Sequence, residues 1–192
     1  MKNILTVLLI LFTFKATAQI PEIVWQQCYG DSGNNWYVQA QAINDGYVFA
    51  INVTSGENVT NYHGGTDIWV VRTDSLYNII WEKCYGGSDA DNPLKIIKLN
   101  NTEFFVFGYT YSTDGDVQSG NHGHSDIWVL KLNIEGDIIW EKTYGCIGID
   151  DARDMILTPD GGFVMIDRIG IGGGDVTHFM ELAIAGWQNA TP

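Results

Sequence analysis

Apolar and polar residues alternate in short segments along this chain, and glycine, asparagine and aspartate separate the segments. Four segments follow one another at 78–85, 94–99, 103–112 and 126–133. A period of two, with enrichment in Val, Ile, Phe, Tyr and Trp, predicts β-strands. No segment keeps apolar residues at helical spacing for two turns, so the sequence predicts an all-β protein.

The alternation also predicts which side chains face the core. In the segment DIWVLKLN, Trp128, Leu130 and Leu132 share one face, which we expect to be the core face, with the alternate residues on the opposite side. In the next segment Trp140 and Tyr144 share a side. We expect these two rings to pack between neighbouring sheets.

A 25-residue block occurs twice, at 63–87 and at 122–146, and 13 of its 25 aligned positions are identical. A repeat on this scale is one supersecondary unit that cannot bury its own apolar face, so copies must stack. We therefore predict one repeat domain over 19–192. Its copies cover about 35–85, 91–144 and 151–192.

Each period has room for four strands, which predicts a β-propeller-like array of three four-stranded antiparallel blades. The segment 23–29 resembles a lone fourth strand, and the last copy lacks one, so 23–29 is placed to complete the last blade. Three blades fall below the usual four to eight. The array is therefore partial or open, or is completed by several chains, or is a shortened relative of a longer array.

The first residues have the three parts of a secretory signal peptide. Lys2 precedes an apolar run at 4–14, and Ala16-Thr17-Ala18 follows it. We expect 1–18 to be a signal peptide. The run is shorter than the ~20 residues that span a bilayer. The predicted localisation is extracellular, at the cell surface or periplasmic, without membrane insertion after cleavage.

The chain is acidic, with a formal net charge of −13. This charge argues against nucleic acid or anionic lipid as a partner, because no basic patch attracts phosphate. A net negative charge of this size favours solubility and the binding of divalent cations.

Three cysteines cannot all pair within one chain. Cys28 and Cys84 occupy equivalent positions, QQCYG and EKCYG, and copies in register keep such positions apart. We expect Cys28, Cys84 and Cys146 to be unpaired small core residues.

Several motifs carry a resemblance to a known family. They are Tyr85-Gly86-Gly87-Ser88 with Asp91, Gly108-Tyr109-Thr110 with Ser112, Asp114-Gly115-Asp116-Val117, and His122-Gly123 with Asp126-Ile127-Trp128. Through them residues 23–187 resemble the β-propeller repeats of exported proteins from Gram-negative bacteria. The resemblance implies a propeller fold and export, and no catalytic residue. Members often have more copies and a C-terminal sorting domain for type IX secretion, and this sequence departs from that pattern in both.

Asp114 and Asp116 are the candidate metal ligands, with His122, His124 and Asp126 nearby, and calcium is the cofactor they suggest. Turn chemistry explains the same residues, because aspartate and glycine form tight loops and an aspartate ahead of a strand accepts backbone N–H groups. The repeated position of His63 and His122 indicates a structural hydrogen bond.

Tyr62, Tyr109 and Tyr111, together with Tyr37, lie within three residues of a glycine or an asparagine and are the candidate ligand-binding residues. Aromatic faces on loops bind glycans or partner proteins. Core packing is the competing explanation.

The sequence contains no GxSxG motif, and no residue set predicts catalysis. We therefore expect an exported, non-enzymatic binding or scaffold module of the bacterial cell surface. Two alternatives stay open. One is an extracellular carbohydrate-active enzyme using acids such as Asp150 and Asp151. The other is a cation-dependent adhesion module.

Overall fold

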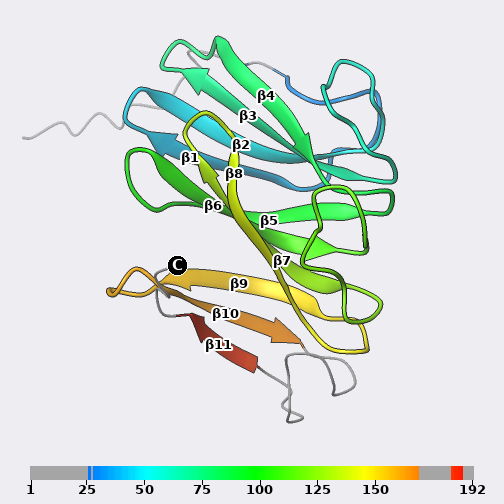
Figure 1. Ribbon diagram of the computed structural model, residues 1–192. Helices are drawn as coiled ribbons and strands as arrows, with labels where there is room; N and C mark the ends of the chain where they lie inside the picture. Colours follow the sequence, from blue (N-terminus) through cyan, green and yellow to red (C-terminus); the bar gives the residue numbers. More distant parts are fainter. Residues whose placement is uncertain (1–25, 27, 169–182, 188–192) are drawn as a thin grey trace, which may run out of the picture.

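The fold consists entirely of strands and loops in the part of the chain that the computed structural model describes, which is residues 26, 28–168 and 183–187. No helix occurs among these residues, so the predicted all-β class is confirmed. The strands are β1 (Val38–Ile43), β2 (Gly46–Val53), β3 (Asp67–Asp74), β4 (Ile79–Tyr85), β5 (Asp91–Lys98), β6 (Glu103–Thr110), β7 (Asp126–Asn133), β8 (Ile138–Tyr144), β9 (Asp151–Leu157), β10 (Phe163–Arg168) and β11 (Ala183–Trp187) (Figure 1).

The strands form three antiparallel sheets in chain order. Sheet 1 has the order β1-β2-β3-β4, sheet 2 has β5-β6-β7-β8, and sheet 3 has β11-β10-β9. The four segments predicted by alternation correspond to β4, β5, β6 and β7. A fourth strand was expected in the last sheet, and the described residues supply three. The segment 23–29, expected to complete it, lies mostly outside the described residues, and its described members 26, 28 and 29 are not in a strand.

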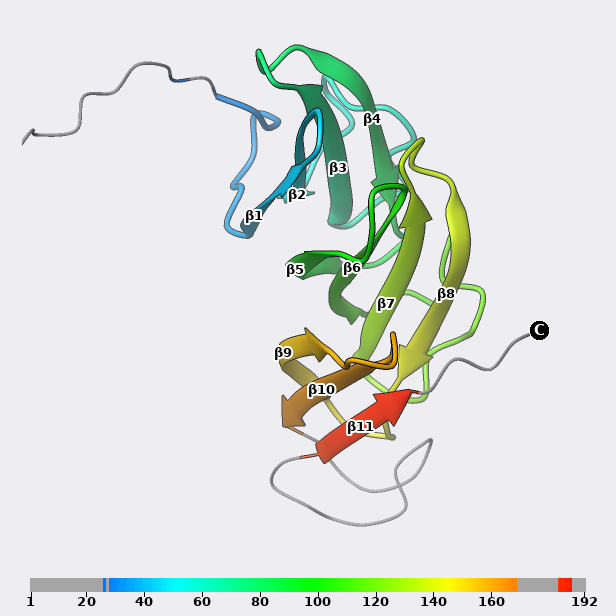
Figure 2. The ribbon, with the colours of Figure 1, turned by 90° about the vertical axis from the view of Figure 1, so that its left-hand side faces the viewer.

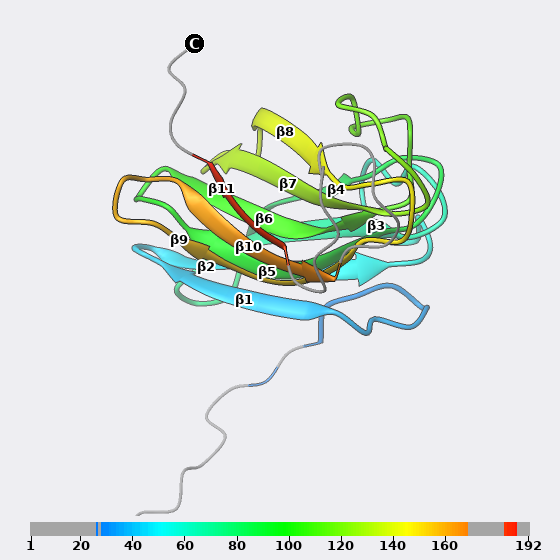
Figure 3. The same cartoon turned by 90° about the horizontal axis from the view of Figure 1, so that it is seen from below.

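The three sheets are stacked face to face like an opened fan. Figure 2 shows β1, β5 and β9 following one another along one side of the stack, while β4 and β8 are splayed apart on the other. Seen from below, the sheets lie over one another (Figure 3). Short turns close one end of each hairpin, and longer loops, at 54–66 and 111–125, connect strands at the other.

The core lies between the sheets. Sheets 1 and 2 share a cluster of Val48, Ala50, Ile68, Val70, Tyr85, Ile96, Phe104, Val106, Val117, Trp128, Leu130 and Leu132. Sheets 2 and 3 share one of Phe105, Phe107, Ile127, Val129, Met155, Phe163 and Met165. A side chain of this size contributes about 1.5–3 kcal/mol when fully buried. The stacking of sheets is therefore the main source of stability.

Both faces of β7 are buried, which corrects the prediction of a single core face. Trp128 and Leu130 face sheet 1, but Ile127 and Val129, from the supposed outer face, are 3% and 0% exposed. The reason is that sheet 2 has a neighbouring sheet on each side. The prediction that Trp140 and Tyr144 pack between sheets is confirmed. Both rings pack against the cluster that sheets 2 and 3 share, with ring centroids 5.6 Å from Phe105 for Trp140 and 6.2 Å from Phe163 for Tyr144.

The cysteines are not disulfide-bonded, as predicted, but one of them is not a core residue. Cys84 and Cys146 are buried, whereas Cys28 is exposed. Cys84 lies in β4 with its backbone N–H bonded to the carbonyl of Thr60, so a loop covers it. Cys28 precedes β1 in a stretch that belongs to no described sheet, so its side chain faces solvent.

The two copies of the sequence block make the same polar contacts. Trp69 Nε1 donates to Glu82 at 2.6 Å, and Trp128 Nε1 donates to Glu141 at 2.8 Å. These bonds satisfy an indole N–H that burial would otherwise leave unpaired. Identity between the copies at these positions therefore has a structural cause.

The predicted signal peptide, 1–18, lies outside the described residues. Within them, no helical segment with the length and apolar character of a bilayer span is found.

Candidate functional site

Four aromatic side chains form a continuous row at the loop end of sheets 1 and 2. Tyr37 and Tyr109 have ring centroids 6.2 Å apart, Tyr109 and Tyr111 6.1 Å, and Tyr111 and His124 5.7 Å. All three contacts are edge-to-face, the arrangement that the ring quadrupole favours. We call Tyr37, Tyr109, Tyr111 and His124 the aromatic row.

The local structure explains how these rings meet. Tyr109 is near the end of β6, and the Tyr111 N–H donates to the carbonyl of Ala90 at 2.9 Å. Tyr37 precedes β1, where its N–H and that of Trp36 donate to Asn52 Oδ1 at 2.8 and 2.7 Å. Asn52 is buried, so this amide fixes the start of β1. The hydroxyls of Tyr37 and Tyr109 then lie 3.2 Å apart.

The row stays accessible on the Tyr37 side. Tyr37 is 36% exposed, and the adjacent Trp36 is 77% exposed. A tryptophan with three quarters of its surface in water gains little from folding, and loop aromatics beside other aromatics are typical of ligand-binding surfaces.

The structure places two of the three predicted ligand-binding tyrosines together. Tyr109 and Tyr111 belong to the aromatic row, whereas Tyr62 does not. The Tyr62 hydroxyl donates to the carbonyls of Thr54 at 3.0 Å and Gly65 at 2.8 Å, so this side chain ties the 54–66 loop together. His124 was weighed in the sequence only as a metal ligand, and its ring contact with Tyr111 depends on the path of the loop.

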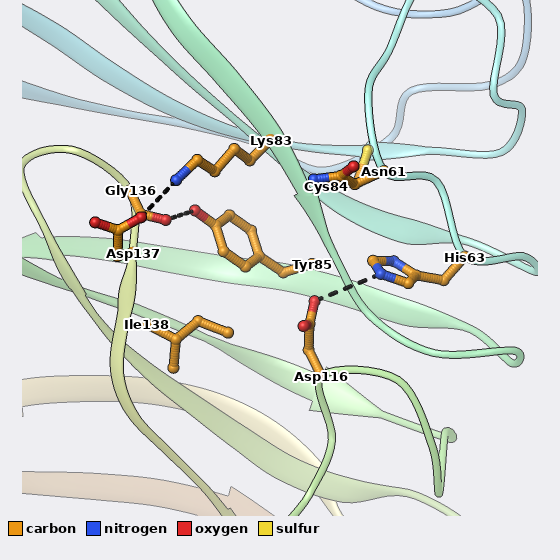
Figure 4. A pocket seen from close by; sticks show the side chains of 9 residues that line it. All are labelled: Asn61, His63, Lys83, Cys84, Tyr85, Asp116, Gly136, Asp137 and Ile138. Carbon is orange, nitrogen blue, oxygen red and sulfur yellow. Dashed lines mark hydrogen bonds and ion pairs between the residues drawn. The ribbon is translucent and has the colours of Figure 1, made fainter.

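A pocket of about 260 Å³ lies between sheets 1 and 2 beside β4. Its lining comes from β4, from the loop before β3, from the loop after β6 and from the β7–β8 turn (Figure 4). The turn lies against β4 because Tyr85 Oη donates to the Gly136 carbonyl and Lys83 Nζ donates to Asp137 at 2.9 Å. Sequence patterns do not show this pocket, because its lining residues come from four segments that are far apart in the sequence.

His63 lies in this pocket between two carboxylates. Its Nδ1 lies 2.8 Å from Asp67 Oδ2, and its Nε2 lies 3.8 Å from Asp116 Oδ2. Asp67 Oδ2 also accepts the His63 backbone N–H at 2.8 Å. In the second copy Asp126 Oδ2 makes the same two contacts, 2.6 Å from His122 Nδ1 and 2.9 Å from the His122 backbone nitrogen. The expected structural hydrogen bond of both histidines is therefore confirmed.

The pocket does not activate its cysteine. Burial raises the pKa of the Cys84 thiol far above its ordinary value, and the nearby Asp67 and Glu82 charges add to the effect. A thiol with a raised pKa is a poor nucleophile, because the thiolate is the reactive form. In the second copy of the block, Thr143 is the equivalent of Cys84, and His122 and Asp126 are the equivalent His–Asp pair.

The two candidate metal ligands hold loops together. Asp114 Oδ1 accepts the Ser88 N–H at 2.7 Å, and Asp116 Oδ2 accepts the Gly86 N–H at 3.3 Å. The Ser88 bond lowers the pKa of Asp114, whereas burial raises that of Asp116. No group of three His, Cys, Asp or Glu side chains arranged for a metal ion is found in the part of the chain that the structure describes.

Asp150, a candidate catalytic acid, is 1% exposed. Its carboxylate accepts the Cys146 N–H at 2.6 Å and the Cys146 Sγ–H at 3.0 Å, so it closes the turn between β8 and β9. The side chain of Asp151 lies outside the described residues.

Comparison with known proteins adds no relative. No family model matches the chain, and no curated protein matches it significantly.

Proposed function

We propose that this chain is an exported, non-enzymatic binding module built on an open β-propeller array. Three observations support the propeller arrangement. The sheets are antiparallel meanders stacked face to face, and β1, β5 and β9 follow one another on one side. The parallel bridge between Thr66 and Ala90 at the first junction recurs as that between Ser125 and Ile149 at the second. Export rests on the charged, apolar and small-residue parts of 1–18.

The aromatic row is the ligand-binding surface of this module, and its continuity across sheets 1 and 2 is the observation that carries the proposal. Rings that touch edge to face present flat apolar faces beside hydroxyl and imidazole groups. Such surfaces suit a ligand with apolar faces and many hydroxyls, which is a neutral glycan. The net charge of −13 disfavours polyanionic ligands at this surface.

The alternative functions have less support. A carbohydrate-active enzyme needs two carboxyl groups facing each other across a cleft, and Asp150 is committed to a buried turn. The His–Asp pairs recur with their surroundings in two sheets, which indicates a structural role. A calcium-dependent adhesion module needs six to eight oxygen ligands, and Asp114 and Asp116 already accept backbone N–H groups.

Calorimetric titration with neutral hexose oligosaccharides and their sulfated counterparts tests the proposal. We expect the neutral glycans to bind and the sulfated ones to bind more weakly. Tyr111→Ala should weaken binding at least about tenfold, which corresponds to ~1.4 kcal/mol. Leu76→Ala is the control, because Leu76 is 76% exposed in the β3–β4 turn. Equal binding by Tyr111→Ala and the native chain contradicts the proposal.

A further inference from the structure

One face of sheet 3 carries exposed apolar side chains, beside Asp154, which lies opposite Ile166. Ile156 and Ile166 are 56% and 37% exposed, and Val164 lies between them on the same face, directly opposite Ile156 in the β9–β10 ladder. We call Ile156, Val164 and Ile166 the open flank. An apolar sheet face of this kind marks an interaction surface.

The open flank corresponds position by position to a face that is covered elsewhere in the same molecule. In the β5–β6 ladder Ile97 lies opposite Phe105, as Ile156 lies opposite Val164. Phe105 and Phe107 are 2% and 0% exposed because sheet 3 packs on them. A further sheet, stacked on sheet 3 as sheet 3 is stacked on sheet 2, would therefore fit the open flank.

The opposite flank of the molecule, on sheet 1, shows the matching half of such a junction. Tyr29 Oη donates to the Tyr77 carbonyl at 2.9 Å, and its ring lies 5.7 Å from Phe49. Tyr85 makes the same bond to the Gly136 carbonyl at the junction of sheets 1 and 2. Tyr29 thus occupies the place that the outer strand of a preceding sheet would take.

The two flanks complement each other. On sheet 1, Tyr29 takes the position of a last-strand residue, but no described sheet precedes sheet 1. In sheet 3, β11 is an edge strand, and no described strand pairs with its free edge. We propose that a second molecule of this chain docks with its sheet 1 against sheet 3 of the first. Its sheet 1 then covers the open flank, and its residues around Tyr29 lie beside β11. This goes beyond the proposed glycan binding and does not depend on it.

Two molecules joined in this way contribute six sheets. Six lies within the four to eight blades of closed propellers, and a two-fold axis through the ring makes the two contacts identical. Apolar burial drives the contact, while the net charge of −13 on each molecule opposes it. Higher salt should therefore strengthen the association, because it screens the repulsion.

Sedimentation equilibrium of residues 19–192 in low and high salt tests the proposal. We expect a dimer whose dissociation constant falls as salt rises. Ile156→Glu should weaken the dimer at least about tenfold, because it places a charge in the apolar contact. The control is Ile139→Glu, at a similarly exposed isoleucine (46%) on β8, away from both flanks. It should leave the dimer intact.

Three results overturn the proposal. They are a native monomer at all salt concentrations, a dimer that Ile156→Glu and Ile139→Glu affect equally, and an open-ended polymer in place of a closed dimer. Circular dichroism of each variant separates loss of association from loss of folding, because Ile156 is already exposed within one molecule and its substitution should leave the spectrum unchanged.

Discussion

Asp67 and Asp91 face each other across the backbone of Gly86. A β-carbon at Gly86 would lie 2.9 Å from Asp67 Oδ1 and 2.7 Å from Asp91 Oδ2, so the two carboxylates are within about 6 Å of each other. Both residues are 0% exposed, and the Oδ1 atom of each has no hydrogen-bond partner among the residues that the structure describes. Asp126 and Asp150 flank Gly145 in the same way at the next junction.

This pairing predicts that the protein is more stable at pH 5 than at pH 7.5. Burial, together with a smaller contribution from the neighbouring Asp67 charge, raises the pKa of Asp91 from 3.8 to about 6. The folded state therefore binds more protons than the unfolded state between pH 4 and 6, and stability falls as pH rises through 6. We expect a loss of about 1–2 kcal/mol for this group, measured by urea unfolding at both pH values.

Asp91→Asn is the matched variant for this prediction. Asparagine keeps an oxygen for the Gly87 N–H and removes the charge, and Asn35 already stands at the corresponding place after Tyr29-Gly30. The variant should gain about 1 kcal/mol at pH 7.5 and show a smaller pH dependence. A pH dependence identical to that of the native chain would sink the idea that Asp91 carries it.

The sequence predicted the strands well but the burial of their faces poorly. Strand positions follow from local alternation, as β7 shows. Whether one or both faces are covered depends on how many sheets stack, and nothing in the segment DIWVLKLN reports that number. Lys131 made one face look polar, yet this long side chain reaches Glu103 at 3.1 Å while its neighbours Ile127 and Val129 stay buried.

The candidate site was predicted in its parts but not in its arrangement. Tyr109 and Tyr111 are close in sequence, so their proximity is local. Tyr37 lies 72 residues from Tyr109, and only the packing of sheet 1 on sheet 2 brings their hydroxyls to 3.2 Å. Tyr62 has the same local signature as the others. Its different role depends on two carbonyls in its own loop.

Trp128 should be far more important for stability than Trp36. Trp128 is 0% exposed between sheets 1 and 2, with its indole N–H bonded to Glu141, whereas Trp36 is 77% exposed. Trp128→Ala should cost about 3–5 kcal/mol, because it leaves a cavity and removes one of the hydrogen bonds that Glu141 accepts. Trp36→Ala should change stability by less than about 0.5 kcal/mol. Urea unfolding of both variants measures the difference, and similar losses would contradict the assignment of the core.

The thiols should differ in reactivity. Cys28 is exposed, whereas Cys84 and Cys146 are buried, and burial raises the pKa of Cys84. A disulfide reagent should therefore modify one thiol in the native protein and three in denaturant. Cys28→Ser should abolish the native reaction. Rapid native modification of a second thiol would show that β4 or the β8–β9 turn opens readily.

Gly136 should tolerate a side chain less well than Gly120, although both have positive φ. Gly136 has φ 77° and Gly120 has φ 84°, so alanine brings similar backbone strain to each. A β-carbon at Gly136 would lie 2.8 Å from the Trp81 ring, whereas one at Gly120 meets nothing within 4 Å. Gly120→Ala should therefore cost about 1 kcal/mol. Gly136→Ala should cost at least about 1 kcal/mol more, because Trp81 must move and the β7–β8 turn then packs less closely against β4. Thermal or urea unfolding measures the two losses. If they prove equal, the turn is not packed on Trp81 in solution, and the junction between sheets 1 and 2 is looser than its contacts indicate.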